Sequence, residues 1–122
     1  EIAALMQNCD LVISRAGSGA INEIIKTKSP SILIPYPDAK TNHQEKNALI
    51  LSSIGCSIMI EQNKNLAKNL KKNLQRIFDM ESKNLKNQYK ILEIMKNNFS
   101  EFNLRDSKKE IKKIINSYKK YL

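Results

Sequence analysis

Short apolar runs alternate along the chain with longer segments in which apolar residues recur at every third or fourth position. The first pattern is typical of strands buried in a parallel sheet, and the second of helices with one apolar face. Apolar runs at residues 11–14, 32–34 and 57–60 therefore predict three strands. The segments with helical spacing predict helices at residues 1–8, 18–27, 43–53, 66–78, 85–99 and 107–120.

This alternation of strand and helix predicts an α/β fold, a Rossmann-like open parallel sheet flanked by helices. The length of 122 residues fits one domain. Pro30 and Pro35 mark the two ends of the second strand, because proline is tolerated at the ends of a central strand and not inside it. The carboxyl ends of neighbouring parallel strands face one crevice, so we expect the turn after residue 14 and the loop at residues 35–42 to meet there.

The turn between the first strand and the following helix carries Gly17 and Gly19. Glycines in this place allow either a positive φ or the close approach of a bound group, and the helix that starts there directs free N–H groups at the turn. The arrangement predicts a phosphate site, with Glu23 placed to accept hydrogen bonds from a ribose. The pattern lacks the third glycine of a dinucleotide fingerprint and the Lys-Thr step of a Walker loop, so the glycines alone also fit a plain turn.

Three blocks taken together carry a family resemblance. Residues 10–24 (DLVISRAGSGAINEI), 30–37 (PSILIPYP) and 42–48 (NHQEKNA) resemble the C-terminal, donor-binding domain of the MurG transferase family. These are glycosyltransferases of the GT-B class that add N-acetylglucosamine to lipid I. The resemblance implies that the chain is the C-terminal half of such an enzyme, a donor-nucleotide-sugar-binding domain over residues 1–122, and a fragment that lacks the N-terminal acceptor domain.

The place of Arg15 in the sequence, and the resemblance for the other residues, imply roles for single side chains. Arg15 lies beside the phosphate site, where it offsets diphosphate charge, pairs with a carboxylate of the absent domain, or is a plain surface arginine. Glu23 binds the ribose in this scheme, and a surface pair with Lys26 is its alternative. The remaining implied contacts are Gly17, Ser18 and Gly19 with the diphosphate, and His43 and Gln44 with the N-acetylglucosamine or its phosphate link.

The implied activity is inverting transfer from UDP-N-acetylglucosamine to a lipid-linked muramoyl pentapeptide, which converts lipid I to lipid II in peptidoglycan synthesis. The general base is expected in the missing domain, so no catalytic residue is assigned in this chain. His43 is interpreted either as a ligand of the donor or as a residue at the start of a helix that has no ligand. No Asp-x-Asp is present, and we expect neither a metal ion nor a cofactor. The family places the protein at the cytoplasmic face of the bacterial inner membrane, as a peripheral protein.

Two positions depart from the family pattern. Ala20 stands where a hydroxyl residue is usual, so a phosphate hydrogen bond is either missing or supplied by Ser18. Lys28 stands near a position where a glycine is usual, which leaves the exit from the predicted helix unexplained.

The net charge of +9 is unevenly distributed. Residues 1–62 carry a net charge of −1 and residues 63–122 a net charge of +10. Such a bias suits contact with an anionic membrane or plain solvated helix faces, whereas the absence of interleaved aromatic residues argues against nucleic acid. Cys9 and Cys56 form no metal or disulfide pattern, and we expect both to be small buried hydrophobic residues.

Other functions remain open at this level. One is a stand-alone donor-binding subunit, like the small subunit of the eukaryotic enzyme that adds the second N-acetylglucosamine to dolichol. A second is a non-enzymatic module that binds nucleotide sugars. A third is a basic protein of nucleic-acid or lipid surfaces, whose binding would fall steeply with salt.

Overall fold

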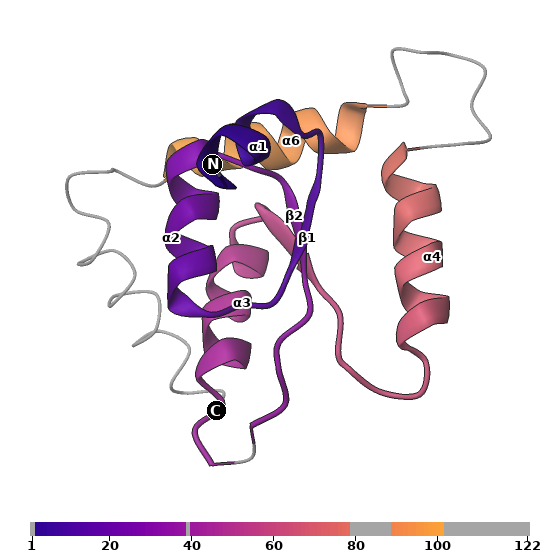
Figure 1. The fold of residues 1–122 in the computed structure, drawn as a ribbon. Coiled ribbons are helices and arrows are strands. Elements are labelled where there is room, and N and C mark those ends of the chain that lie inside the picture. Colours follow the sequence, from indigo (N-terminus) through magenta and orange to yellow (C-terminus); the bar gives the residue numbers. More distant parts are fainter. Residues whose placement is uncertain (1, 39, 79–88, 102–122) are drawn as a thin grey trace.

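A computed structural model describes residues 2–38, 40–78 and 89–101. Its centre is a parallel sheet of three strands in the order β1-β2-β3 (Figure 1). The strands are β1 (Val12–Ser14), β2 (Ser31–Leu33) and β3 (Ser57–Met59). Every residue of β2 is buried, as expected for the central strand, and Ile13, Ile32 and Ile58 lie side by side in register. The predicted fold class is confirmed, with each strand within a residue or so of its predicted bounds.

Helices cover both faces of the sheet (Figure 1). Helices α2 (Ser18–Thr27) and α3 (His43–Ser53) pack on the face that carries Leu33, and α4 (Leu66–Phe78) packs on the face that carries Ile32. Helix α6 (Lys90–Asn98) lies across the amino ends of the strands and continues into a short 3-10 turn, η1 (Phe99–Glu101). Two apolar clusters result, one on each face of the sheet.

Helix α1 (Ile2–Asn8) packs against α2 and buries none of its residues fully. The predicted apolar face is therefore largely exposed, since Ile2 and Leu5 keep 66% and 67% of their surface accessible. Cys9 is also exposed, so the expectation that both cysteines are buried is wrong for Cys9 and confirmed for Cys56. The physical reason is that α2 covers only one side of this short helix.

Two helices end in the same way, with one residue in the left-handed conformation. Gly55, with φ of 77°, follows α3, and the next N–H, that of Cys56, donates to the Leu51 carbonyl at 3.0 Å. After α2 the same place is taken by Lys28, with φ of 52° and ψ of 49°. The following N–H, that of Ser29, closes on the Ile24 carbonyl at 3.1 Å. The C-terminus of α2, where the usual glycine is missing, is thus formed by Lys28 in a conformation that favours glycine.

The predicted helix at residues 107–120, and residues 85–88 of the one before it, lie outside the described residues. None of the helices within the described ranges has the length and apolar character needed to cross a membrane.

Candidate functional site

The glycine turn joins β1 to α2 at the carboxyl edge of the sheet. Gly17 is the N-cap residue of α2, with φ of −67° and ψ of 157°, and no side chain caps this helix. The first hydrogen bond inside the helix is from the Ile21 N–H to the Gly17 carbonyl, at 3.0 Å. Among the described residues, the N–H groups of residues 18–20 therefore have no partner. They form the kind of site where a helix end binds an anion.

The two glycines of this turn do not adopt a positive φ; of the three glycines in the chain, only Gly55 does. The prediction that these glycines allow a positive φ is therefore wrong. What they provide is open space: a Cβ at Gly19 would meet nothing within 4 Å, and one at Gly17 would lie 3.8 Å from Gln44 Nε2. The backbone over the helix end is accessible to a group that binds closely.

Helix α3 holds this turn through two side-chain amides. The Ala16 N–H donates to Gln44 Oε1 at 3.3 Å, and Asn47 Nδ2 donates to the Ala16 carbonyl at 3.0 Å. Ala16 itself is fully buried. Both backbone groups of the residue before the N-cap are thus fixed from a helix about thirty positions away in sequence.

Gln44 also joins the turn to the loop after β2. Its Oε1 accepts a second hydrogen bond, from the Tyr36 N–H at 2.8 Å. Since both donors are backbone N–H groups, the amide oxygen must face them, and Nε2 faces Gly17. The two loops predicted to meet do meet, and the acceptor half of the Gln44 amide is used in joining them. Only Nε2 is left to donate to a ligand.

Arg15 is exposed at the same edge, directly after β1, and contacts the segments that follow β2 and β3. One guanidinium nitrogen donates to the Ile34 carbonyl at 3.3 Å and to Gln62 Oε1, and the guanidinium lies 5.6 Å from the centre of the Tyr36 ring. These partners are all neutral, so they orient the guanidinium without cancelling its charge.

The other predicted residues lie around the turn. Ser18 is the first residue of α2 and His43 the first of α3, and both are exposed. Glu23 is half-buried in the second turn of α2. Within the described residues its carboxylate has no hydrogen bond or ion pair, and the alternative pair with Lys26 is not formed. The structure therefore gathers the predicted residues at one edge of the sheet. Within the described part of the chain it leaves the polar groups of the Ser18, Glu23 and His43 side chains without hydrogen-bond partners.

Comparison with known proteins places this architecture in a family. The profile of the glycosyltransferase family 28 C-terminal domain matches residues 1–111. The chain belongs to glycosyltransferase family 28.

Its relatives in Prochlorococcus marinus carry one name, UDP-N-acetylglucosamine–N-acetylmuramyl-(pentapeptide) pyrophosphoryl-undecaprenol N-acetylglucosamine transferase. The protein of strain MIT 9312 is 58% identical over 120 residues, and that of strain MIT 9301 is 57% identical over 121 residues. Each match covers 98% of this chain and 33% of the relative. The family 28 chain described here thus spans about a third of the length of these relatives, and the resemblance to the MurG family is confirmed.

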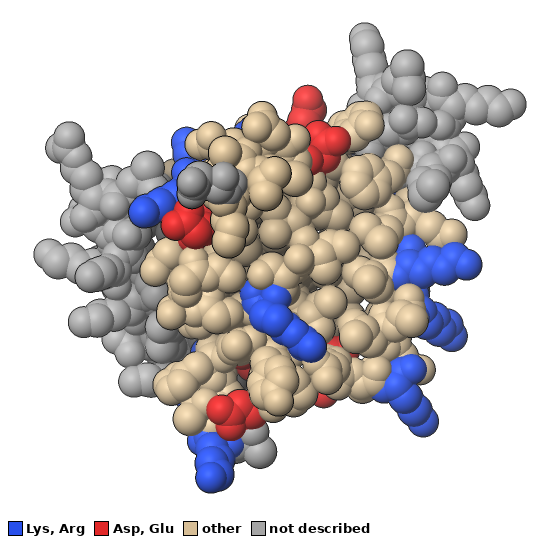
Figure 2. Space-filling view, viewed as in Figure 1, with Lys and Arg blue, Asp and Glu red and all other residues tan. Residues whose placement is uncertain are grey.

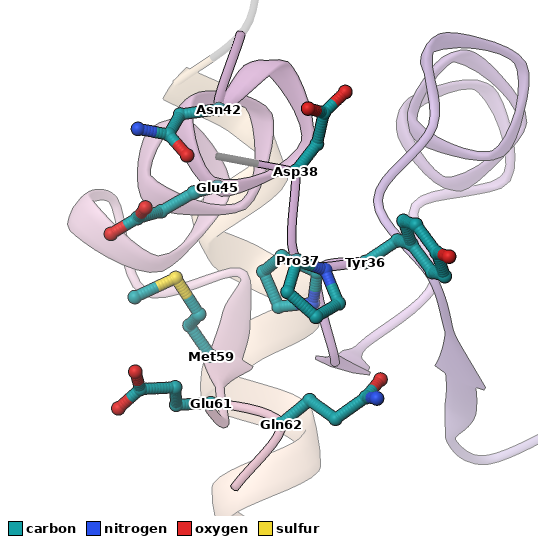
Figure 3. A pocket seen from close by; sticks show the side chains of 9 residues that line it. Tyr36, Pro37, Asp38, Asn42, Glu45, Met59, Glu61 and Gln62 are labelled. Atoms are coloured by element: carbon teal, nitrogen blue, oxygen red, sulfur yellow. The ribbon is translucent and has the colours of Figure 1, made fainter. Parts of the chain in front are cut away.

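The family 28 domain has a second feature beside the turn, a pocket of about 450 Å³ between the loops that follow β2 and β3 (Figure 3). In that view the Tyr36 ring lies on the side away from Met59 and Glu45. No residue predicted for the site lines this pocket. It is lined by Pro35, Tyr36, Pro37, Asp38, Asn42, Glu45, Met59, Glu61 and Gln62.

Charge separates this pocket from the glycine turn. Asp38, Glu45 and Glu61 bring three carboxylates to it, and a diphosphate would be repelled there. Asp38 is fixed by its own loop: Oδ1 accepts from the Lys40 N–H at 3.0 Å and Oδ2 from the Thr41 hydroxyl at 3.1 Å. These hydrogen bonds, the Lys40 N–H first, hold the pKa of Asp38 below its ordinary value. Anions are expected on the Arg15 side and not in the pocket.

Sequence reasoning missed the pocket and the part played by Asn47. The only available signal for Asn47 was a polar residue one turn after Gln44, directly before the buried Ala48.

No group of three or more His, Cys, Asp or Glu side chains within the described residues is arranged to hold a metal ion.

Proposed function

We propose that this chain is the donor-binding part of an inverting transferase that moves N-acetylglucosamine from UDP-N-acetylglucosamine to a lipid-linked muramoyl pentapeptide, converting lipid I to lipid II. The observation that carries the proposal is the uncapped start of α2, open to solvent over two glycines and held in place from α3. The names of the relatives support it, because they give the same donor and a pyrophosphoryl-undecaprenol acceptor.

In this scheme the diphosphate lies over Gly17, Ser18 and Gly19 and accepts hydrogen bonds from the free N–H groups. Negative charge grows on the leaving diphosphate as the bond from the anomeric carbon to the phosphate oxygen breaks. Preorganised N–H groups and the helix dipole stabilise that charge without having to reorient, which is where such a site contributes to rate. Arg15, whose partners are all neutral, adds its charge to the same field.

The sugars of the donor have partners on either side of the turn. Glu23 accepts hydrogen bonds from the ribose hydroxyls, since its carboxylate has no partner among the described residues and lies in the second turn of α2. His43 and the Nε2 of Gln44 bind the N-acetylglucosamine or its phosphate link. The acceptor hydroxyl attacks the anomeric carbon directly, and its proton passes to a base in the remaining part of the protein, which lies at the cytoplasmic face of the inner membrane as a peripheral protein.

Titration calorimetry of the protein with UDP-N-acetylglucosamine, with GDP-mannose as the competing nucleotide sugar, tests the proposal. We expect selective binding of the UDP-sugar and at least tenfold weaker binding in Glu23→Ala, about 1.4 kcal/mol. Glu93→Ala, on the exposed side of α6, is the matched control and leaves affinity unchanged. Equal binding of both nucleotide sugars, or equal affinity of Glu23→Ala and the parent, would contradict the assignment.

A further inference from the structure

Helix α4 carries a row of basic side chains along one side. Lys68, Lys71, Lys72 and Arg76 are spaced at i, i+3, i+4 and i+8, which places them on one face of a helix, and all four are exposed. We call these four residues the α4 basic row. Figure 2 shows blue side chains projecting along the edge of the molecule where Figure 1 places α4. From Lys68 to Arg76 the row is about 12 Å long.

The opposite side of α4 is packed against the sheet. Leu66, Leu70, Leu74 and Ile77 belong to the apolar cluster that includes Ile32 and Met95. The helix therefore cannot turn its basic side inward, and the row faces outward permanently.

The charge of the row is unbalanced. Residues 66–78 contain no Asp or Glu, so no opposite charge within α4 offsets the four cations. Lys68 with Lys72, and Lys72 with Arg76, are like-charged pairs at i and i+4, a spacing that destabilises a helix. Helix faces that serve only for solubility usually carry both positive and negative side chains. A row of positive side chains alone attracts a negatively charged surface.

We propose that the α4 basic row is a contact surface for the anionic head groups of a membrane. The proposal rests on the proposed function, because a transferase whose acceptor is attached to undecaprenol works where that lipid lies. Loop residues 61–65 link the two surfaces: Gln62 contacts Arg15 at the candidate site, and α4 begins at Leu66. A membrane bound by the row would therefore lie on a helix that is connected to the candidate site by a loop of five residues.

A nucleic acid is the less favoured polyanion. The row contains no aromatic side chain on which a base stacks, and Phe78, at the end of α4, is half-buried with its ring edge-on to Tyr89 at 6.3 Å between ring centres. A lipid head-group surface needs only charge on an outward face, which is what the row offers.

Vesicle cosedimentation of the intact protein tests the proposal. The test variant is Lys68→Gln/Lys72→Gln/Arg76→Gln, and the matched control removes three exposed lysines elsewhere, Lys26→Gln/Lys90→Gln/Lys96→Gln. On vesicles of phosphatidylglycerol and phosphatidylcholine, we expect the test variant to bind about a hundredfold more weakly, and the control to bind within about threefold of the parent. Binding of the parent is expected to fall as salt is raised and to be absent on pure phosphatidylcholine.

Three results would overturn the proposal. The first is an equal loss of vesicle affinity in the two triple variants, and the second is equal binding of the parent to neutral and anionic vesicles. The third is a test variant that keeps its vesicle affinity and loses affinity only for a duplex oligonucleotide, measured in parallel. Titration of the same variants with UDP-N-acetylglucosamine without lipid separates this inference from the proposed function. The α4 variant is expected to keep the affinity of the parent for the donor. Failure of the donor titration in the parent would count against the proposed function alone, while the vesicle result stands by itself.

Discussion

Asn47 Nδ2 donates a hydrogen bond of 3.0 Å to the carbonyl oxygen of Ala16, a residue with no exposed surface that directly precedes the start of α2. The bond joins the middle of α3 to the glycine turn. It is one of two that decide where the free N–H groups of α2 point, since the other backbone group of Ala16 is bound by Gln44.

Replacing Asn47 by Ala is expected to destabilise the fold by about 1–3 kcal/mol, because the buried Ala16 carbonyl would lose its donor. Urea denaturation measures the loss. The matched control is Asn73→Ala in α4, whose side chain bonds a carbonyl of its own helix at 2.8 Å, and it is expected to cost less than about 0.5 kcal/mol. Equal losses in the two variants would show that the bond to Ala16 has no special role.

Two substitutions of Gln44 separate its part in the fold from its part in binding. Gln44→Glu keeps acceptor oxygens for the N–H groups of Ala16 and Tyr36, so we expect stability within about 1 kcal/mol of the parent. It removes Nε2 and adds a negative charge, and UDP-sugar affinity should fall at least about tenfold. Gln44→Leu is expected to lose both stability and affinity. A Gln44→Glu variant that binds the donor as well as the parent would rule out a ligand role for Nε2.

Alanine at Gly19 and at Gly55 is expected to have opposite effects. At Gly55, a Cβ would lie 2.5 Å from Asn98 Nδ2, which itself donates to the Gly55 carbonyl at 3.0 Å, and φ is 77°. Gly55→Ala should therefore cost about 2 kcal/mol or more without a direct effect on the site. Gly19→Ala lies in a helix with open space around it, so it should stabilise the fold by up to about 1 kcal/mol while weakening donor binding. Thermal unfolding and donor titration of both variants provide the comparison.

Lys28→Gly is expected to stabilise the chain by about 1 kcal/mol. At φ of 52° the backbone is in the left-handed conformation, which is unfavourable for lysine and costs glycine little. Lys26→Gly, inside the same helix, is the control and should destabilise by about the same amount. In urea denaturation, the free energy of unfolding is expected to rise in Lys28→Gly and to fall in Lys26→Gly. Loss of stability in both variants would mean that the Lys28 side chain makes a stabilising contribution of its own.

The pKa of Asp38 is expected to lie below its ordinary value when followed by NMR of its carboxyl carbon. A lowered pKa in the folded state means that the contribution of this carboxylate to stability is present above the pKa of the unfolded chain. It is lost as the pH falls through the folded value. Thr41→Val removes one of the hydrogen bonds to the carboxylate and should raise the pKa part of the way back. An unchanged pKa in that variant would leave the Lys40 N–H as the cause.

The sequence predicted the strands well because each is a short apolar run with a clear boundary. Pro30 precedes β2 and Pro35 follows close behind its end, and Gly55 separates α3 from β3. The meeting of the glycine turn with the loop after β2 was also predictable, because it follows from the geometry of any parallel sheet.

The rest depended on contacts that leave no periodic signal. Helical spacing identified an apolar face on α1 but cannot tell whether a neighbour covers it, so the exposure of Leu5 and Cys9 was not foreseen. The bonds from Gln44 and Asn47 to Ala16 connect side chains to backbone across 28 and 31 positions. The same long range applies to Arg15 and Gln62, 47 positions apart. The ligand contacts of the candidate site stay predictions.

These long-range bonds also link occupancy of the site to the folding equilibrium. These bonds join the turn, the loop after β2 and the start of α3, so the site is complete only in the folded chain. A ligand that binds there draws the equilibrium towards the native state by mass action, by about 2.7 kcal/mol when its free concentration is a hundred times its Kd. A rise in melting temperature with added nucleotide sugar would thus report on the site even when no acceptor is present to be glycosylated.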